Sequence, residues 1–228
     1  MRFGRLPGIA FKRHIGRMKE RTPRPRIIED CDHAPSDWTA AYDKLIANLR
    51  RLNVGASAPK PGDRFPDFAL PDLGGRMRKL ADLVADGAIV LTFNRGSWCT
   101  FCRDELEAWR ARAGQLADKG LRLVLVSPET GGRSELLRNL VGPQAELLCD
   151  VDQGVALSAG LTFRCSDEVQ RRYLACGLDL SEIYGGGGWL LPIPATFLID
   201  RSATVRYAFV DPDFRKRAEP DAVFASLA

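Results

Sequence analysis

The 228-residue sequence is poor in histidine, with only His14 and His33, and both lie near its beginning. A zinc site usually takes four ligands, from two Cys-x-x-Cys pairs or from one such pair and two histidines. Only one such pair occurs, Cys99 and Cys102. The run Gly185–Gly188 lacks the lysine and the serine or threonine of a phosphate-binding loop. We therefore expect neither a metal nor another cofactor.

Long apolar runs are also missing, because no stretch approaches the ~18–20 residues that a membrane-spanning helix needs. The composition, 45% hydrophobic and 27% charged, is typical of a globular protein. The net charge of +4 is uneven: residues 1–30 hold nine basic and three acidic residues, and the rest holds 24 basic and 26 acidic residues. The near-neutral remainder predicts no nucleic-acid partner, and the short apolar runs predict no membrane span.

The basic beginning of the chain has no hydrophobic core of the kind found in secretory signals. We expect residues 1–34 to be a disordered arm and the protein to be cytoplasmic. A weak tether to an acidic partner or to lipid headgroups is the functional alternative for this arm.

Short apolar runs alternate with helical patterns along the rest of the chain. We predict a first helix over 36–53 on an apolar stripe at helical spacing, followed by a linker to about residue 60. Hairpin, strand and helix signals then follow in the order hairpin 65–75, strand 88–93, helix 104–120, strand 121–129, helix 134–141, strand 145–150, hairpin 194–210 and a helix from Pro220. Buried strands alternating with helices predict an α/β sandwich, and the closing hairpin makes its sheet mixed.

The stretch RGSWCTFC, residues 95–102, places two thiols between a buried strand and a helix. A helix N-terminus favours a thiolate over a thiol, and Arg95 adds positive charge nearby. The spacing lets Cys102 reach Cys99 and close a disulfide, so the pair could attack an oxidised substrate and resolve the adduct. Trp98 would shield one sulfur from water. Two cysteines that merely pack are the structural alternative.

Pro194 stands directly before the apolar strand PATFLID. A cis Ile193–Pro194 bond beside the thiols would expose the Ile193 backbone to an incoming disulfide or peptide, and we favour this interpretation. A trans proline that marks the start of the strand is the alternative.

Three segments together resemble a known family: GDRFPDFALPDLGGRMRKLADL, AIVLTFNRGSWCTFC and LPIPATFLIDRSATVRYAFVDPDFRKRAEP. They are similar to the peroxiredoxin-like branch of the alkyl hydroperoxide reductase/thiol-specific antioxidant (AhpC/TSA, redoxin) family. The resemblance covers roughly residues 60–220 and implies a thioredoxin-like three-layer sandwich over 61–228, with an insert at about 162–188 and the first helix before it. It also implies thiol-dependent peroxide reduction, with electrons from thioredoxin or a similar dithiol donor.

The sequence departs from the family pattern Pro-x-x-x-Thr-x-x-Cys at two positions. Arg95 takes the place of the proline and Cys99 that of the threonine, while Cys102 falls on the peroxidatic cysteine. The hydroxyls of Ser97 and Thr100 are near in the sequence. The arginine that the family carries later in the chain corresponds to about Pro194, and Arg95 is the candidate substitute. The alignment makes Cys102 the nucleophile, whereas the logic of thioredoxin-type reductases makes it Cys99, which we favour.

Three functions compete. The first is a peroxidase that reduces hydrogen peroxide or organic hydroperoxides through Cys99 and Cys102, the second a protein disulfide oxidoreductase, and the third a thioredoxin-fold binding module. The insert covers the thiols or packs peripherally, with Cys165 and Cys176 as a candidate disulfide relay. We interpret the charged run near the C-terminus as a solvated, salt-bridged turn of Asp211, Asp213, Arg215, Arg217 and Glu219. For the oligomeric state, a homodimer is one alternative.

Overall fold

The structure is a computed structural model that describes residues 35–186 and 189–227. The basic arm predicted over 1–34, with His14, His33 and Cys31, lies outside the described residues.

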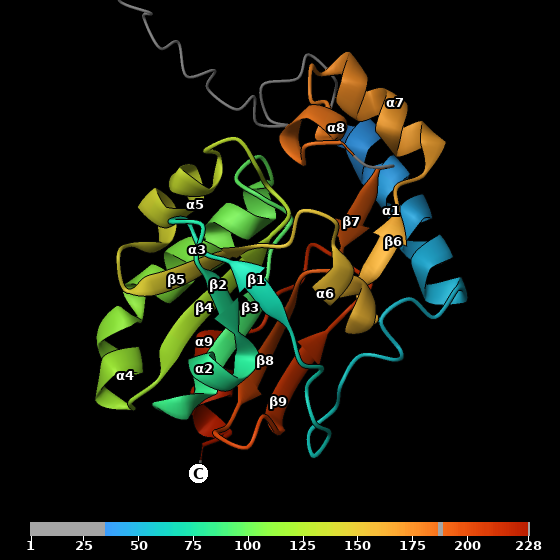
Figure 1. The fold of residues 1–228 in the computed structure, drawn as a ribbon. Helices are drawn as coiled ribbons and strands as arrows, with labels where there is room; N and C mark the ends of the chain where they lie inside the picture. Colours follow the sequence, from blue (N-terminus) through green and yellow to red (C-terminus); the bar gives the residue numbers. More distant parts are fainter. Residues whose placement is uncertain (1–34, 187–188, 228) are drawn as a thin grey trace, which may run out of the picture.

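A five-stranded mixed sheet forms the centre of the molecule, in the order β5-β4-β3-β8-β9 (Figure 1). β3 pairs in parallel with β4, and β4 with β5, whereas β8 runs antiparallel to both β3 and β9. The bounds are β3 Ile89–Phe93, β4 Arg122–Ser127, β5 Ala145–Cys149, β8 Ala195–Ile199 and β9 Val205–Val210. These strands confirm the mixed sheet that the sequence predicts.

Alternate residues of β3 belong to two different cores, because successive side chains of a strand point to opposite faces. Val90 packs in one core with Leu106 and Trp109. Leu91 packs in the other core with Phe65. Helices that contribute to the first core are α3 Thr100–Ala111, α4 Ala113–Asp118, α5 Ser134–Val141 and α9 Pro220–Ala225. The second is closed by the hairpin β1 Ala69–Pro71 and β2 Met77–Lys79, with α2 Leu80–Ala85 and α6 Gly154–Ser158. The fold is therefore the predicted three-layer α/β sandwich.

A third core joins the beginning of the described chain to the insert. Helix α1, Pro35–Arg51, packs against α7, Asp167–Ala175, and Figure 1 shows both beside α8, Leu180–Ile183. The first strand of the insert, β6 Thr162–Arg164, pairs antiparallel with β7 Leu190–Pro192, which directly follows the insert. The predicted apolar stripe of α1 is buried as far as Leu49, but Leu52 is exposed because the helix ends at Arg51.

The helix predicted over 104–120 begins earlier, at Thr100, and is divided at Arg112, whose backbone leaves the helical region (φ −103°, ψ 10°). The earlier start is important for function, because it places Cys99 at the N-cap of α3 and Cys102 in its first turn. Among the helices described, none has the length and apolar character needed to cross a membrane.

Candidate active site

The loop between β3 and α3 has a defined backbone that carries both thiols. The Asn94 N–H donates to the Val126 carbonyl at 2.8 Å, and Asn94 Oδ1 accepts from the Gly96 N–H at 3.1 Å. The Cys99 N–H then donates to the Gly96 carbonyl at 3.2 Å, which leads the chain into α3. The helix N-terminus therefore directs its positive dipole end at the thiols.

Both cysteines are free thiols, and both are buried: Cys99 is 2% exposed and Cys102 is fully enclosed. Burial by itself would raise the pKa of Cys99, but a hydrogen bond from the Cys102 thiol and the charges of Arg95 and Arg217 outweigh it and lower the pKa to about 6. Burial and the neighbouring Cys99 charge raise the pKa of Cys102. At neutral pH the pair therefore carries one proton, on Cys102, and one negative charge, on Cys99.

Hydrogen-bond donors nevertheless converge on Cys102 rather than on Cys99. The Arg95 backbone N–H lies 3.4 Å from Cys102 Sγ, and the Arg217 guanidinium donates to the same sulfur at 3.3 Å. The donors thus favour an anion on Cys102, whereas the charge distribution favours one on Cys99. We place the resting thiolate on Cys99, because the Cys102 thiol is its hydrogen-bond donor. The donors around Cys102 can then stabilise the charge when Cys99 is oxidised.

Arg217 is a site residue that the sequence reasoning missed, and the prediction of a solvated turn is wrong for its side chain, which is only 12% exposed. Its Nε donates to Glu105 Oε2 at 2.8 Å, and a terminal nitrogen donates to the carbonyls of Phe214 and Lys216. Nothing in local spacing links Arg217 to Cys102, because 115 positions separate them. The one available signal is the aromatic Phe214 within the charged run, which predicts that this turn packs against a core.

Glu105 is the centre of a buried hydrogen-bond network that reaches the thiols through Arg217. Its Oε1 accepts from Thr92 Oγ1 at 2.9 Å and from Thr196 Oγ1 at 3.3 Å, while its Oε2 faces Arg217. Burial raises the pKa of Glu105 to about 7, with Arg217 opposing and Cys102 adding to that rise. Glu105 thus holds the guanidinium that contacts Cys102.

Arg95, predicted as a supporting residue, is buried within an aromatic enclosure. Its guanidinium donates to the Tyr173 hydroxyl at 2.9 Å and lies 4.9 Å from the Trp98 ring and 4.3 Å from the Phe214 ring. Within residues 35–186 and 189–227 it forms no ion pair with a carboxylate. Burial disfavours its charge, but Tyr173 and Cys99 keep the pKa of Arg95 above its ordinary value. The Cys99 thiolate therefore supplies negative charge to this buried cation.

Ser97, which the sequence offered as a hydroxyl for the substrate, donates instead to Glu129 Oε1 at 3.0 Å. Glu129 is 1% exposed, and burial raises its pKa to about 7. Its second oxygen has no hydrogen-bond partner among the described residues. Gly96 makes room for this carboxyl, because a Cβ there would lie 2.6 Å from Glu129 Oε1 and its φ is +129°. Thr100, the first residue of α3, is partly buried.

Two tyrosines of the insert pack in the same core as the thiols. Trp98 Nε1 donates to the Tyr184 hydroxyl at 3.3 Å, and that hydroxyl donates to the Arg95 carbonyl at 2.6 Å. Tyr173 and Tyr184, both from the insert, share one buried cluster with Cys99, Cys102 and Trp98. Trp98 is itself fully enclosed.

The structure contradicts two further expectations, at Pro194 and at Cys165. The Ile193–Pro194 peptide is trans, so the cis interpretation is wrong. Ile193 is enclosed, and its N–H donates to the Leu161 carbonyl at 2.7 Å, which leaves this donor unavailable to an incoming peptide. Cys165 is a buried free thiol, so it forms no disulfide with Cys176. Within the described part of the chain, no group of three or more histidine, cysteine or carboxylate side chains is arranged to hold a metal ion.

The chain is similar to known proteins in sequence and in fold. The sequence model of the AhpC/TSA family matches residues 61–208, which is more than half of the chain. A curated protein of Mycobacterium tuberculosis named "Putative peroxiredoxin" is 31% identical over 100 residues, which cover 44% of this chain. The match spans 63% of that relative's own length.

Solved structures show the same fold at low sequence identity. The peroxidoxin BcpB of Mycobacterium tuberculosis superposes with a TM-score of 0.57 and 24% identity, over 74% of this chain and 96% of that one. Reduced Prx3 of Vibrio vulnificus in complex with hydrogen peroxide gives a TM-score of 0.58 and 19% identity, over 74% and 98% of the two chains.

Proposed function

Because this chain belongs to the AhpC/TSA family, we propose that it is a thiol-dependent peroxidase in which Cys99 attacks the peroxide and Cys102 resolves the product. One observation carries the proposal. A thiol whose pKa lies at about 6 sits at a helix N-terminus, hydrogen-bonded to a second thiol and within reach of the charges of Arg95 and Arg217. Such a sulfur is ionised at neutral pH, and the thiolate is the nucleophilic form of cysteine.

In the first step the Cys99 thiolate attacks one oxygen of hydrogen peroxide, and the O–O bond breaks. The sulfur is oxidised to a sulfenic acid, and the departing hydroxide takes up a proton and leaves as water. The Cys102 thiol, which donates its hydrogen to Cys99 in the resting state, is the nearest proton source. Loss of that proton leaves an anion on Cys102, where Arg217 and the Arg95 N–H already donate.

In the second step the Cys102 thiolate attacks the Cys99 sulfur. An S–S bond forms, the S–O bond breaks, and the second oxygen leaves as hydroxide that is protonated to water. The two thiols thereby supply the two electrons that reduce the peroxide. A thioredoxin-type dithiol donor then reduces the disulfide and is itself oxidised. The cytoplasm is the compartment we propose, since it maintains such donors in the reduced form.

Burial of the pair favours a small substrate. With Cys99 only 2% exposed and the insert packed over it, hydrogen peroxide can be accommodated more readily than a bulky hydroperoxide or a protein disulfide. This favours the peroxidase over the protein disulfide oxidoreductase. The dithiol donor is itself a protein, so the segment over the pair has to open during recycling.

The experiment exposes reduced protein to one equivalent of hydrogen peroxide in the presence of dimedone, which traps sulfenic acid. The Cys102→Ser variant should accumulate an adduct on Cys99, whereas the Cys99→Ser variant should react slowly. A fast adduct on Cys102 in Cys99→Ser would reverse the two roles. Absence of reaction in both variants, together with reduction of insulin disulfides by the wild type, would replace the peroxidase with the disulfide oxidoreductase.

A further inference from the structure

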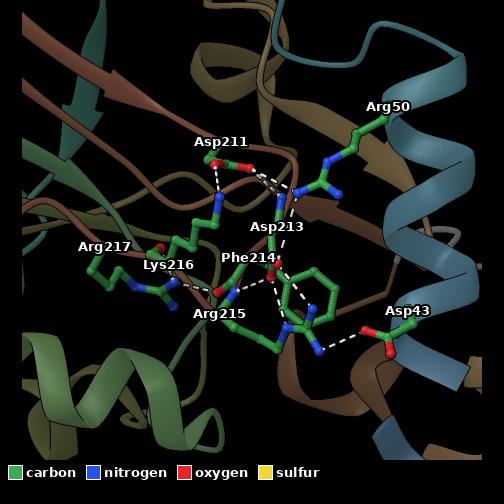
Figure 2. Close-up of polar contacts among 8 residues, drawn as sticks. All are labelled: Asp43, Arg50, Asp211, Asp213, Phe214, Arg215, Lys216 and Arg217. Atoms are coloured by element: carbon green, nitrogen blue, oxygen red, sulfur yellow. Dashed lines mark hydrogen bonds and ion pairs between the residues drawn. The ribbon is translucent and has the colours of Figure 1, made fainter. Parts of the chain in front are cut away.

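Arg217, which donates to Cys102 from outside the loop between β3 and α3, belongs to a turn, residues 211–217, that follows β9. This turn and helix α1 lie on either side of the family match, which ends at residue 208 and begins at residue 61. Figure 2 shows the two brought together by a network of charged side chains. Both segments therefore lie outside the range that the family model matches.

The turn is organised by one carboxylate. Asp213 accepts two hydrogen bonds from the Arg215 guanidinium, at 2.8 and 2.9 Å, and a third from the Arg215 N–H at 3.2 Å. The side chain of Asp213 is 10% exposed, and the hydrogen bonds from Arg215 hold its pKa below the ordinary value. Two-pronged arginine–carboxylate pairs fix geometry as well as adding energy. Asp211 joins by accepting from the Asp213 N–H at 2.8 Å and from Lys216 at 2.8 Å.

Helix α1 makes ion pairs with this turn. Asp43 accepts from Arg215 at 2.8 Å, and Arg50 lies 3.9 Å from both Asp211 and Asp213 (Figure 2). Asp43 and Arg50 are more than half exposed, so each of their ion pairs contributes less than the enclosed pair at Asp213. The charged residues of α1 thus add to a turn that is already internally fixed.

The turn presents two side chains to the site. Phe214 is fully enclosed, with its ring 4.3 Å from the Arg95 guanidinium and edge-on to Tyr42 of α1 at 5.0 Å. Arg217 extends from the same turn, donates to the Phe214 carbonyl, and reaches Cys102 Sγ. One rigid turn therefore sets the position of the Arg217 cation and of an aromatic face against the Arg95 cation.

We propose that Asp213 and Arg215, attached to α1 through Asp43, are positioning residues that hold Arg217 on Cys102 and Phe214 on Arg95, and so maintain the reactive state of the thiol pair. The inference rests on the proposed function for its biological meaning. Its physical content concerns the ionisation of the thiols and can be measured without peroxide.

The charged and titratable groups that face the thiols come from every surrounding element. Two cations, Arg95 and Arg217, favour the thiolate. The carboxyls and phenols oppose the thiolate or are neutral, and these groups are Glu105, Glu129, Tyr42, Tyr173 and Tyr184. Of these, only Arg217 is carried by the turn, so a loosened turn removes a cation and leaves the opposing groups in place. The pKa of the thiol pair should then rise.

The test measures the rate of iodoacetamide alkylation of the reduced full-length chain as a function of pH. Asp213→Asn keeps the size of the side chain and removes its charge, and should slow alkylation at pH 7 roughly fivefold, because the Arg217 cation is displaced but still present. Asp43→Asn should slow it by about two- to threefold, in keeping with its exposure. Arg215→Lys keeps the charge but lacks the two-pronged geometry, and should give an effect between wild type and Asp213→Asn.

Asp221→Asn is the matched control. Asp221 also makes a two-pronged pair, with Arg112 at 3.1 Å, but it belongs to helix α9 and its side chain is 70% exposed. Its alkylation profile should match wild type. The proposal is overturned if folded Asp213→Asn or Arg215→Lys keeps the wild-type profile with only a lower melting temperature, or if Asp221→Asn shifts the profile equally. Failure of the wild type to react with peroxide would reject the proposed function alone, because alkylation requires no peroxide.

Discussion

Arg217→Met removes the guanidinium that bridges Glu105 and Cys102. In the structure this group lies 2.8 Å from the carboxylate and 3.3 Å from the sulfur, in a side chain that is 12% exposed. Methionine keeps much of the apolar stem and carries neither charge nor donor. The substitution therefore tests the electrostatic role of Arg217 more than its packing.

The magnitude follows from the resting pKa of the pair. With the pKa of Cys99 at about 6, roughly nine-tenths of this thiol is ionised at pH 7. A nearby opposite charge lowers a pKa by about one to three, and Arg95 remains in the variant, so we expect a pKa of about 7 to 8. The thiolate fraction at pH 7 should then fall about twofold to tenfold, and alkylation and peroxide reduction should slow in proportion.

The assay follows thiolate absorbance in the ultraviolet across pH 4–10 on reduced protein. Arg112→Met, which removes an arginine from an exposed ion pair, serves as the control and should titrate like wild type. Because Arg217→Met leaves Glu105 buried without its cation, the double variant Arg217→Met with Glu105→Gln should recover stability. A wild-type titration in the single variant Arg217→Met would refute the electrostatic role of Arg217.

Three further outcomes are expected. In urea unfolding, Glu129→Gln should be more stable than wild type at pH 8 and similar to it at pH 5. The buried carboxyl has its pKa raised from 4.5 to about 7, so the wild type keeps the full contribution of this group to stability at low pH and loses it as the pH rises through 7. The expected loss is about 3 kcal/mol of unfolding free energy. An equal gap at both pH values would contradict this reasoning. Gly96→Ala should cost more stability than Gly62→Ala, because both have positive φ but only the first meets a side chain, at 2.6 Å; equal losses would exclude the clash. Tyr173→Phe should lower stability by about 1.5–3 kcal/mol, because the Tyr173 hydroxyl accepts a hydrogen bond from a buried guanidinium. Tyr42→Phe should lower it by less, and chemical unfolding of the two variants measures the difference.

The fold could be predicted where the sequence signal is local. β3, β4 and β5 are short apolar runs buried on both faces, and the helix Ser134–Val141 has the bounds that its pattern predicts. The insert was harder, because its helices and short strands bury their apolar faces against α1 rather than against the central sheet. No local pattern distinguishes such a partner from the main core.

In the site too, a local motif predicts some residues, whereas others depend on contacts between distant segments. The thiol pair at the start of α3 follows from a strand–helix junction, which a short motif can show. Arg217, Glu105 and Glu129 act through contacts between segments far apart in the chain, so spacing gives no access to them. The trans geometry at Pro194 differs from the expectation because the enclosed Ile193 belongs to the core beside the thiols instead of forming an open docking edge.

The most direct test of the central claim is peptide mapping by mass spectrometry after one equivalent of hydrogen peroxide is added to the reduced wild type. We expect loss of two hydrogen atoms and a single new cross-link, the disulfide between Cys99 and Cys102, formed within one molecule. Unmodified thiols at both positions, or oxidation that appears first on another cysteine, would contradict it.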